Sequence, residues 1–462
     1  MLLETRIQTM DKLQRHTRTG LGVSKEYYCQ KKGEPRIGGN VQGKTDVPTM
    51  FALLSDVLLR VHASIAPGLE MHSCNLEHKV QHHSIAFVDD VDGHVTANPD
   101  SEDCARDIVA HLNRAGAIWN NLFEIAGQSI ALHKVRWRTL VWEMRDREWK
   151  LVTSAPGRVK LTDSRGAVAN VDYVPPNEPN EGLGFLMCPD GNQEPQFERV
   201  MSILSEVTDR IARAYLMQDE THQAVYQRVE PKIAYPMALT SFGKDQCRRE
   251  NGELRSKVLP KLKMSRKAPG AVVHGPMEMG GMEWLELYTK QNQLQVPYLM
   301  KQVRHGGPVA EWLHMVMANT QLRTGLMKPI FNSMGTKIEC MGNYFMISLR
   351  NRMEEIGATF WLEKAWVPKL QLKRDESLME RFVATRGINV PMLQRANQVR
   401  LWLRVITIAD LAHVSGKYIA DNMMTGEWRA GSNLLWPNVA KPNQRVWKTF
   451  CKCVKMAFCT GV

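Results

Sequence analysis

The chain has 462 residues, of which 44% are hydrophobic and 23% are charged, a composition typical of a globular protein and not of a disordered or fibrous one. It contains no run of 18 apolar residues, and its first residues lack the basic-then-apolar order of a signal peptide, so neither a membrane span nor a secretory leader is expected. Nine cysteines, an odd number spread along the chain, argue against a disulfide framework and favour a reducing, intracellular location in cytoplasm or nucleus.

The net charge of +12 is unevenly distributed along the chain. Residues 231–462 contain 34 Lys and Arg against 17 Asp and Glu, a balance of +17, which leaves 26 against 31, or −5, for residues 1–230. A basic half joined to an acidic half suggests that one part contacts a polyanion and the other carries metal chemistry. Charge alone fits a merely solvated basic surface equally well.

The first 62 residues predict helix, loop and helix. Residues 1–30 are expected to be helical, with a second short helix over residues 23–30, because apolar side chains recur three to four residues apart. A glycine-rich loop follows over residues 33–48, and after it a further, amphipathic helix is expected over residues 49–62. Pro48 fits the first turn of that helix, where its missing N–H costs nothing. The apolar positions of the first helix are Leu2, Leu3, Ile7, Met10 and Leu13.

The glycine loop also satisfies the phosphate-cradling pattern Gly-x4-Gly-Lys-Thr between Gly38 and Thr45. Such a loop needs a buried strand entering it and a helix leaving it. A helix is expected to leave, but residues 31–36 contain Gly33 and Pro35 and no apolar run. A P-loop NTPase that uses Lys44, Thr45 and Asp89 therefore stays an alternative.

A β-hairpin is predicted over residues 84–95. An apolar run stops at two adjacent acids, Asp89 and Asp90, then a Val-Asp-Gly turn is expected before the return strand from His94. Neighbouring carboxylates repel each other, and hard divalent cations prefer carboxylate oxygens, so the pair suggests a site for Mg²⁺ (or Mn²⁺). The other interpretation is a solvated turn that happens to hold acids.

Histidine and cysteine side chains gather just before this hairpin. Their spacing matches no strong zinc signature, and the cysteine lacks a partner cysteine, so a polar stretch entering the hairpin is the preferred interpretation over a zinc site. The residues are His72, Cys74, His78, His82 and His83.

Beyond the hairpin, the pattern predicts an α+β layer. Residues 99–101 should cap a helix that Gly127 ends. Residues 135–144 alternate as a strand, and a second strand should return over residues 149–153. Lys134 stands just before the first of these strands, where a polyphosphate contact and a solvated lysine are about equally expected.

The remainder is expected to be mainly helical from Gln196, after a Pro/Asn-rich break at residues 175–181. Residues 239–267 contain nine Lys and Arg against three acids, which favours a phosphate-tracking surface. Residues 270–281 should interrupt the helices, an amphipathic helix should open the stretch 393–424, and loop should follow to the end. The expected domains are residues 1–180, 181–285 and 286–462.

The order of these motifs resembles a retroelement-type reverse transcriptase, an RNA-directed DNA polymerase. Gln42 and Gly43, with Pro48 opening a helix, are similar to the Gln-Gly loop of that family. The stretch from Phe87 to Asp90 is similar to its aromatic-x-Asp-Asp box, and Lys134 stands where its next palm motif has a lysine.

Further along, Leu183, Gly184 and Phe185 are similar to the segment that grips the primer end. The basic region after it would correspond to the thumb, whose expected nucleic-acid contacts are Lys257, Lys261, Lys263 and Arg266.

The resemblance implies a fold and a reaction. The fold would be a partial polymerase palm with an antiparallel sheet and the Asp-Asp hairpin, followed by a helical thumb and a C-terminal helical region of unknown role. The reaction would be two-metal nucleotidyl transfer with Mg²⁺ or Mn²⁺ held by Asp89 and Asp90. Its partners would be an RNA template, a DNA primer and a dNTP, with no membrane. Gln42, Gly43, Pro48, Phe87 and Lys134 would bind the nucleotide.

Two departures from the family bear on activity. Val47 stands where the family often has Ser or Ala. The first catalytic aspartate of the family lies on a strand upstream of the Gln-Gly loop, where only helices are expected here. The chain is therefore expected to be an N-terminally truncated polymerase that lacks a metal ligand and is inactive alone. A non-catalytic nucleic-acid-binding scaffold is the third alternative.

Overall fold

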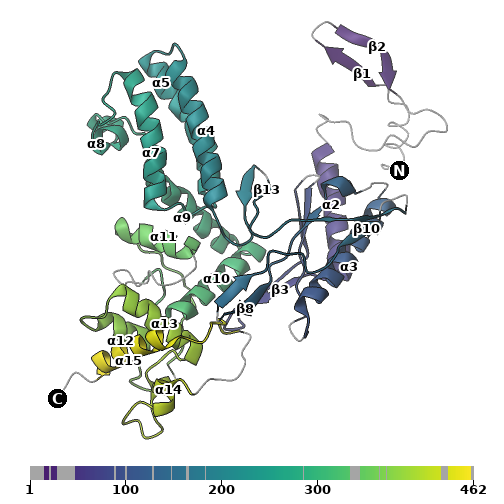
Figure 1. Ribbon diagram of the computed structural model, residues 1–462. Coiled ribbons are helices and arrows are strands. Elements are labelled where there is room, and N and C mark those ends of the chain that lie inside the picture. The colour runs from purple at the N-terminus through teal and green to yellow at the C-terminus, as the bar shows by residue number, and fades with distance from the viewer. Residues whose placement is uncertain are drawn as a thin grey trace. The chain divides into compact units, whose positions relative to one another are not determined.

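The computed structural model describes residues 15–19, 22–28, 47–87, 90–98, 101–126, 130–146, 148–162, 166–182, 184–284, 286–332, 344–363, 365–370, 372–427 and 435–458. The chain forms two compact units (Figure 1). Unit 1 comprises residues 1–69, 82–137 and 156–173, and unit 2 comprises residues 70–81, 138–155 and 174–462. Helices and small, mostly antiparallel sheets make up both, which confirms the α+β class.

The first described element is a β-hairpin, so the expected helix over residues 1–30 is wrong for the part that the structure describes. Strand β1, Arg15–Thr19, pairs antiparallel with β2, Gly22–Tyr28. Thr17, Val23 and Tyr27 belong to the β-branched and aromatic types that favour strands, and this local preference prevailed over the helical spacing further upstream. Residues 1–14, which carry that spacing, lie outside the described residues.

Two helices of unit 1 match the expectation closely. Helix α2, Val47–Ile65, has Pro48 in its first turn, and α3 is Cys104–Ile125. The cap of α3 is Asp103, whose carboxylate accepts from the backbone N–H of Arg106 at 3.0 Å, and not the expected residues 99–101. The buried His62 of α2 stacks on Trp119 of α3 with ring centroids 4.3 Å apart.

The core of unit 1 forms where short strands cover α3. Strands β7, Arg136–Trp137, and β12, Asp172–Tyr173, run parallel, and β10, Lys160–Thr162, pairs antiparallel with β11, Val168–Asn170. Gly116 lets Leu161 approach the helix, because a Cβ there would lie 2.3 Å from a Leu161 methyl group. The buried side chains are Trp137, Val159, Leu161 and Val171.

The expected strand over residues 135–144 is divided between the two units. Only its first residues form β7; its end is β8, Trp142–Arg145, in unit 2. Strand β8 pairs antiparallel with β9, Glu148–Leu151, and Asp146 at the turn has φ of 55°. Each sheet among the described strands has two strands, so a continuous palm sheet is not part of what the structure describes.

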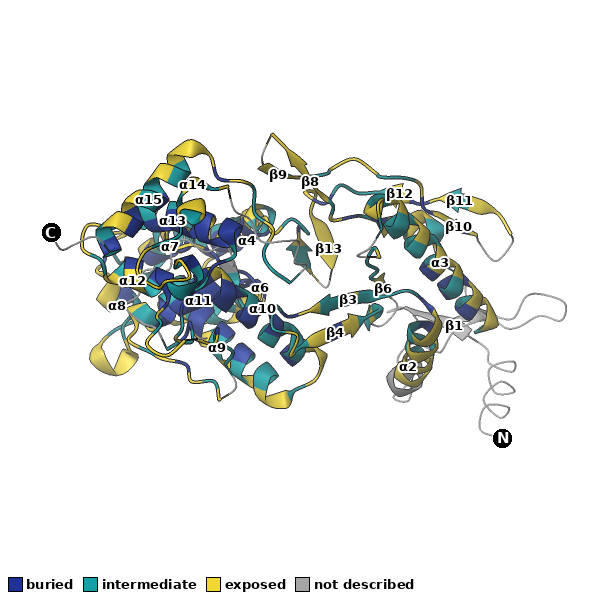
Figure 2. Ribbon diagram, turned by 90° about the horizontal axis from the view of Figure 1, so that it is seen from below, coloured by how far each residue is buried: buried dark blue, intermediate teal, exposed yellow. Residues whose placement is uncertain are grey.

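Unit 2 is mainly helical. A heptad-like series of apolar residues on α4, from Phe197 to Ile211, packs against Cys247, Leu254 and Val258 of α7. Figure 2 shows many buried segments among the helices of unit 2. The helices are α4 Glu194–Arg213, α5 Gln218–Ala224, α6 Glu230–Met237, α7 Lys244–Val258, α8 Gly270–His274, α9 Leu287–His305, α10 Pro308–Thr324, α11 Tyr344–Glu355, α12 Leu378–Ala384, α13 Val390–Leu403, α14 Asp421–Thr425 and α15 Gln444–Phe458.

Two expectations for unit 2 are wrong. The stretch 270–281 is not a plain break, because it contains α8 and the short 3-10 helix Met277–Met279. The chain end is not loop, because α15 packs Phe450, Cys453 and Val454 against α13. The expected helix from Leu393 is confirmed as α13. The predicted three-domain division stays a prediction, although the last crossing between units, at residues 173–174, lies beside the expected break.

Candidate functional site

The Asp-Asp hairpin exists, with its turn earlier than expected. Strand β5, Ser84–Phe87, pairs antiparallel with β6, Asp90–Gly93, and Phe87 lies opposite Asp90. This register leaves a two-residue connection, Val88 and Asp89, which lies outside the described residues. The expected Val-Asp-Gly turn is therefore wrong, because those residues form β6. Asp90 is exposed beside the tip.

Histidines lie at the base of this hairpin. The backbone N–H of His94 donates to the His83 carbonyl at 2.8 Å, and the His82 and His94 rings lie 5.1 Å apart. Burial lowers the pKa of both His82 and His94, which favours their neutral forms. Further upstream, His78 Nδ1 lies 2.8 Å from a Glu311 carboxylate oxygen.

No group of three or more His, Cys, Asp and Glu side chains suited to a metal ion occurs within the described ranges. The zinc interpretation of residues 72–83 therefore has no structural support there. For Mg²⁺, adjacent carboxylates are chemically suitable donors, but a two-ion site needs carboxylates from more than one segment. Contrary to expectation, a strand does precede the Gln-Gly loop, yet the acid in β1 and β2 is Glu26 and not aspartate.

The expected nucleotide-binding residues are not brought together by what the structure describes. Gln42 and Gly43 lie outside the described residues, as do Lys44 and Thr45 of the P-loop alternative. Pro48 belongs to α2 and Phe87 to β5, and Lys134 is the exposed last residue of the 3-10 helix Leu132–Lys134.

The expected primer-grip segment is the tip of a second hairpin. Strand β13, Asn180–Gly182, pairs with β14, Phe185–Met187, and Gly184 has φ of +77°, a conformation that glycine adopts without strain. Leu183 lies outside the described residues. The hairpin is fixed to α4, because Gln196 Oε1 accepts from the Leu186 N–H at 2.6 Å.

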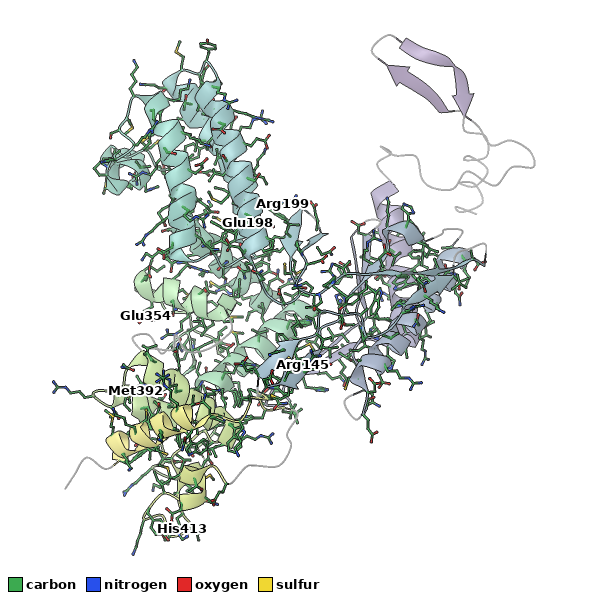
Figure 3. The ribbon with its side chains drawn as sticks, viewed as in Figure 1. Arg145, Glu198, Arg199, Glu354, Met392 and His413 are labelled. Atoms are coloured by element: carbon green, nitrogen blue, oxygen red, sulfur yellow. The ribbon has the colours of Figure 1, made fainter. Side chains whose placement is uncertain are left out.

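An ion pair adds to this attachment. Arg199 of α4, labelled in Figure 3, lies 2.6 Å from a carboxylate oxygen of Glu181 in β13. These two contacts hold the hairpin of β13 and β14 beside the first turns of α4.

Two of the four expected nucleic-acid contacts have structural roles. The ammonium of Lys257 lies 2.9 Å from Asp209 Oδ1 on α4 and also pairs with Glu253, and these bonds raise the pKa of Lys257. Lys261 Nζ donates at 2.8 Å to the Ala214 carbonyl, where α4 ends. Both lysines thus fasten α7 and the turn after it to α4.

The other two expected contacts are exposed. Lys263 has φ of 57° at the end of the 3-10 helix Leu259–Leu262, and Arg266 follows in the connection to α8. Arg248 and Arg255 belong to the basic stretch 239–267 but were not among the expected contacts. They lie seven residues apart on one face of α7 and line a groove with Arg266 and His274. That helical spacing within the basic stretch was the available signal.

We expect Lys257→Met to lower the melting temperature by about 2 °C, because Asp209 and Glu253 lose a shared cation on a partly exposed surface. Lys263→Met is the matched control, since its side chain is exposed after the same helix, and it should leave the melting temperature unchanged. Thermal unfolding followed by circular dichroism measures both. Equal shifts would contradict the structural role of Lys257.

No family model, curated protein or solved structure matches this chain. In the described part of the chain, no helix is both long and apolar enough to span a membrane.

Proposed function

We propose that this chain is a nucleotidyltransferase of the reverse-transcriptase type. The observation that carries the proposal is an antiparallel hairpin in which Asp90 pairs with Phe87, next to the connection between its two strands; Asp89 itself lies outside the described residues. A P-loop NTPase would instead hold its magnesium-binding acid at the end of a strand in a parallel sheet. The hairpin geometry supports the polymerase interpretation over that alternative.

The second hairpin and the helix pair add support. An exposed Gly184 turn, fixed to α4, suits close approach of a nucleic-acid strand, because no side chain stands between backbone and strand. The net charge of +17 over residues 231–462 suits a partner that carries phosphates.

Asp89 and Asp90 would hold the divalent ion, with a third carboxylate from another segment. When bound, such an ion lowers the pKa of an attacking hydroxyl and stabilises the charge on a leaving pyrophosphate. In this proposal the hairpin of β5 and β6 provides carboxylates for the ion, and the Gly184 turn contacts a nucleic-acid strand.

The test is Mn²⁺ binding by the 462-residue chain, followed by electron paramagnetic resonance. Weak binding is expected, and the double variant Asp89→Asn, Asp90→Asn should abolish it, because the amides carry no charge. Asp92→Asn is the matched control from the same hairpin, where Asp92 lies opposite Ile85. Binding that survives the double variant but not Asp92→Asn would reject the assignment.

Primer extension tests the reaction itself. We expect weak extension at most, because among the described residues no further segment provides a carboxylate to complete a metal site with the hairpin. Asp89→Asn should remove whatever extension there is. ATP hydrolysis that depends on Lys44 would instead favour the P-loop NTPase.

A further inference from the structure

An open groove of about 500 Å³ runs along α7 in unit 2. One wall is α7 itself, with Arg248, Asn251 and Arg255, and the other is formed by Arg266 and His274 of the following segment. Three guanidinium groups thus converge on a single hollow. Among the described residues, the acid in its lining is Glu286.

The guanidinium of Arg255 is oriented in advance. It donates through Nη2 to the Ala268 carbonyl, while its Nε is buried and has no partner among the described residues. The Ala268 bond therefore fixes where the guanidinium of Arg255 stands in the wall of the groove.

The acid in the lining is already engaged. Glu286 caps α9 by accepting from the N–H and the hydroxyl of Thr289, both at 2.7 Å. It also accepts from Asn251 Nδ2 at 3.2 Å. Its charge is therefore partly compensated by donors and by the positive end of α9, and the groove remains basic.

The wall opposite α7 is built to a fixed shape. His274 Nδ1 donates to the Trp284 carbonyl at 2.9 Å, which fixes the orientation of the imidazole ring; Nε2 takes no part in this bond. The backbone N–H of Trp284 in turn donates to the Val273 carbonyl at 3.0 Å. Gly275 and Gly281 meet so closely that a Cβ on Gly281 would lie 2.1 Å from the Gly275 oxygen. Side chains larger than hydrogen at Gly281 are thus excluded.

Arg248 adds a cation that can leave its present partner, Asp245, and turn to a ligand in the groove. It pairs with Asp245 at 2.8 Å, but both side chains are largely exposed, so the pair is weak. Guanidinium groups bind phosphate oxygens in pairs of hydrogen bonds. Apart from His274, the described residues of the lining include no aromatic ring on which a base could stack.

We propose that this α7 groove is a phosphate-binding site, with Arg248, Arg255 and Arg266 as its ligands. The phosphate belongs either to the backbone of a nucleic-acid strand, read without regard to base sequence, or to a free polyphosphate. The site goes beyond the proposed metal chemistry and does not involve the hairpin of β5 and β6.

The experiment uses the full chain and two probes, inorganic tripolyphosphate and a short abasic oligodeoxynucleotide, each titrated by calorimetry. The double variant Arg248→Gln, Arg266→Gln removes two exposed groove cations. The matched control Lys301→Gln, Arg304→Gln removes the same charge from an exposed face of α9.

The groove variant should weaken binding about tenfold or more, whereas the control should change it less than about twofold. Weakening for the oligonucleotide alone identifies a strand backbone as the source of the phosphate, and weakening for both probes identifies any polyphosphate. Equal losses in the two variants, or none in either, would overturn the proposal. Because the readout involves no Mn²⁺, failure here leaves the hairpin assignment untouched, and the converse also holds.

Discussion

Arg400→Met should lower the free energy of unfolding by about 3–5 kcal/mol, because it removes a buried guanidinium on which two helices depend. Arg400 of α13 is fully buried and donates to the Leu322 and Arg323 carbonyls, each at 2.9 Å, at the end of α10. It also donates to Asn397 Oδ1 at 2.7 Å. Methionine would fill much of the volume but cannot donate a hydrogen bond, so the Arg323 carbonyl would keep only Asn397 Nδ2 and the Leu322 carbonyl only the Gly325 N–H as donors.

Urea unfolding measures the effect, with Arg395→Met on the same helix as control. Arg395 is only half-buried, so its substitution should change stability by less than about 1 kcal/mol. Arg400→Lys should restore only part of the lost stability, because one ammonium group cannot donate in all the directions in which a planar guanidinium does. Equal stability of Arg400→Met and Arg395→Met would show that the guanidinium does not join α10 to α13.

Glu250→Gln should stabilise the protein, and the gain should grow with pH. Glu250 lies on the inner face of α7 with no exposed surface, and neither carboxylate oxygen has a partner among the described residues. Burial raises the pKa of Glu250 from 4.5 to about 8. The folded chain therefore retains a proton that the unfolded chain releases above pH 4.5.

The sign follows from proton linkage. Between pH 4.5 and about 8 the folded state binds more protons, so the contribution of Glu250 to stability falls as pH rises and is lowest above pH 8. The two pKa values set an upper bound of about 5 kcal/mol on this loss. Glutamine does not titrate, so the Glu250→Gln variant should not show this loss of stability with rising pH.

Urea unfolding of wild type and Glu250→Gln across pH 5 to 9 gives the difference directly. We expect near-equal stability at the acid end and a gain of about 2–4 kcal/mol at the alkaline end. Glu198→Gln, on the exposed face of α4, is the control and should show no such trend (Figure 3). A pH-independent difference would mean that Glu250 is not a buried acid.

Local sequence signals predicted the elements that carry their own pattern. Pro48 with a periodic apolar face specified α2, and the apolar run before Asp89 specified β5. Helix α15 was missed although Phe450, Cys453 and Val454 recur at helical spacing, so its signal was present in the sequence. The β1–β2 hairpin was missed because two strands of mixed polarity carry no strict alternation.

The two candidate sites also differ in how far the sequence alone could predict them. The Asp-Asp pair is a contiguous motif, and the sequence alone predicted its hairpin. The α7 groove joins Arg248 to His274 across a turn whose shape depends on close packing of Gly275 and Gly281. Likewise, the ion pairs of Lys257 with α4 need a known helix packing, so a charge count could not separate structural lysines from available ones.

The chain path between the two units has a consequence for biosynthesis. The chain passes from one unit to the other at residues 69–70, 81–82, 137–138, 155–156 and 173–174. Two early segments of unit 2, residues 70–81 and 138–155, therefore leave the ribosome long before α4 to α15 exist to receive them. Unit 1 can close once residue 173 has emerged, while these segments, whose strands pair only within their own hairpins, are without the rest of unit 2 through more than half of translation. During that interval their strand edges are exposed, and chaperone binding at residues 70–81 and 138–155 is the expected protection.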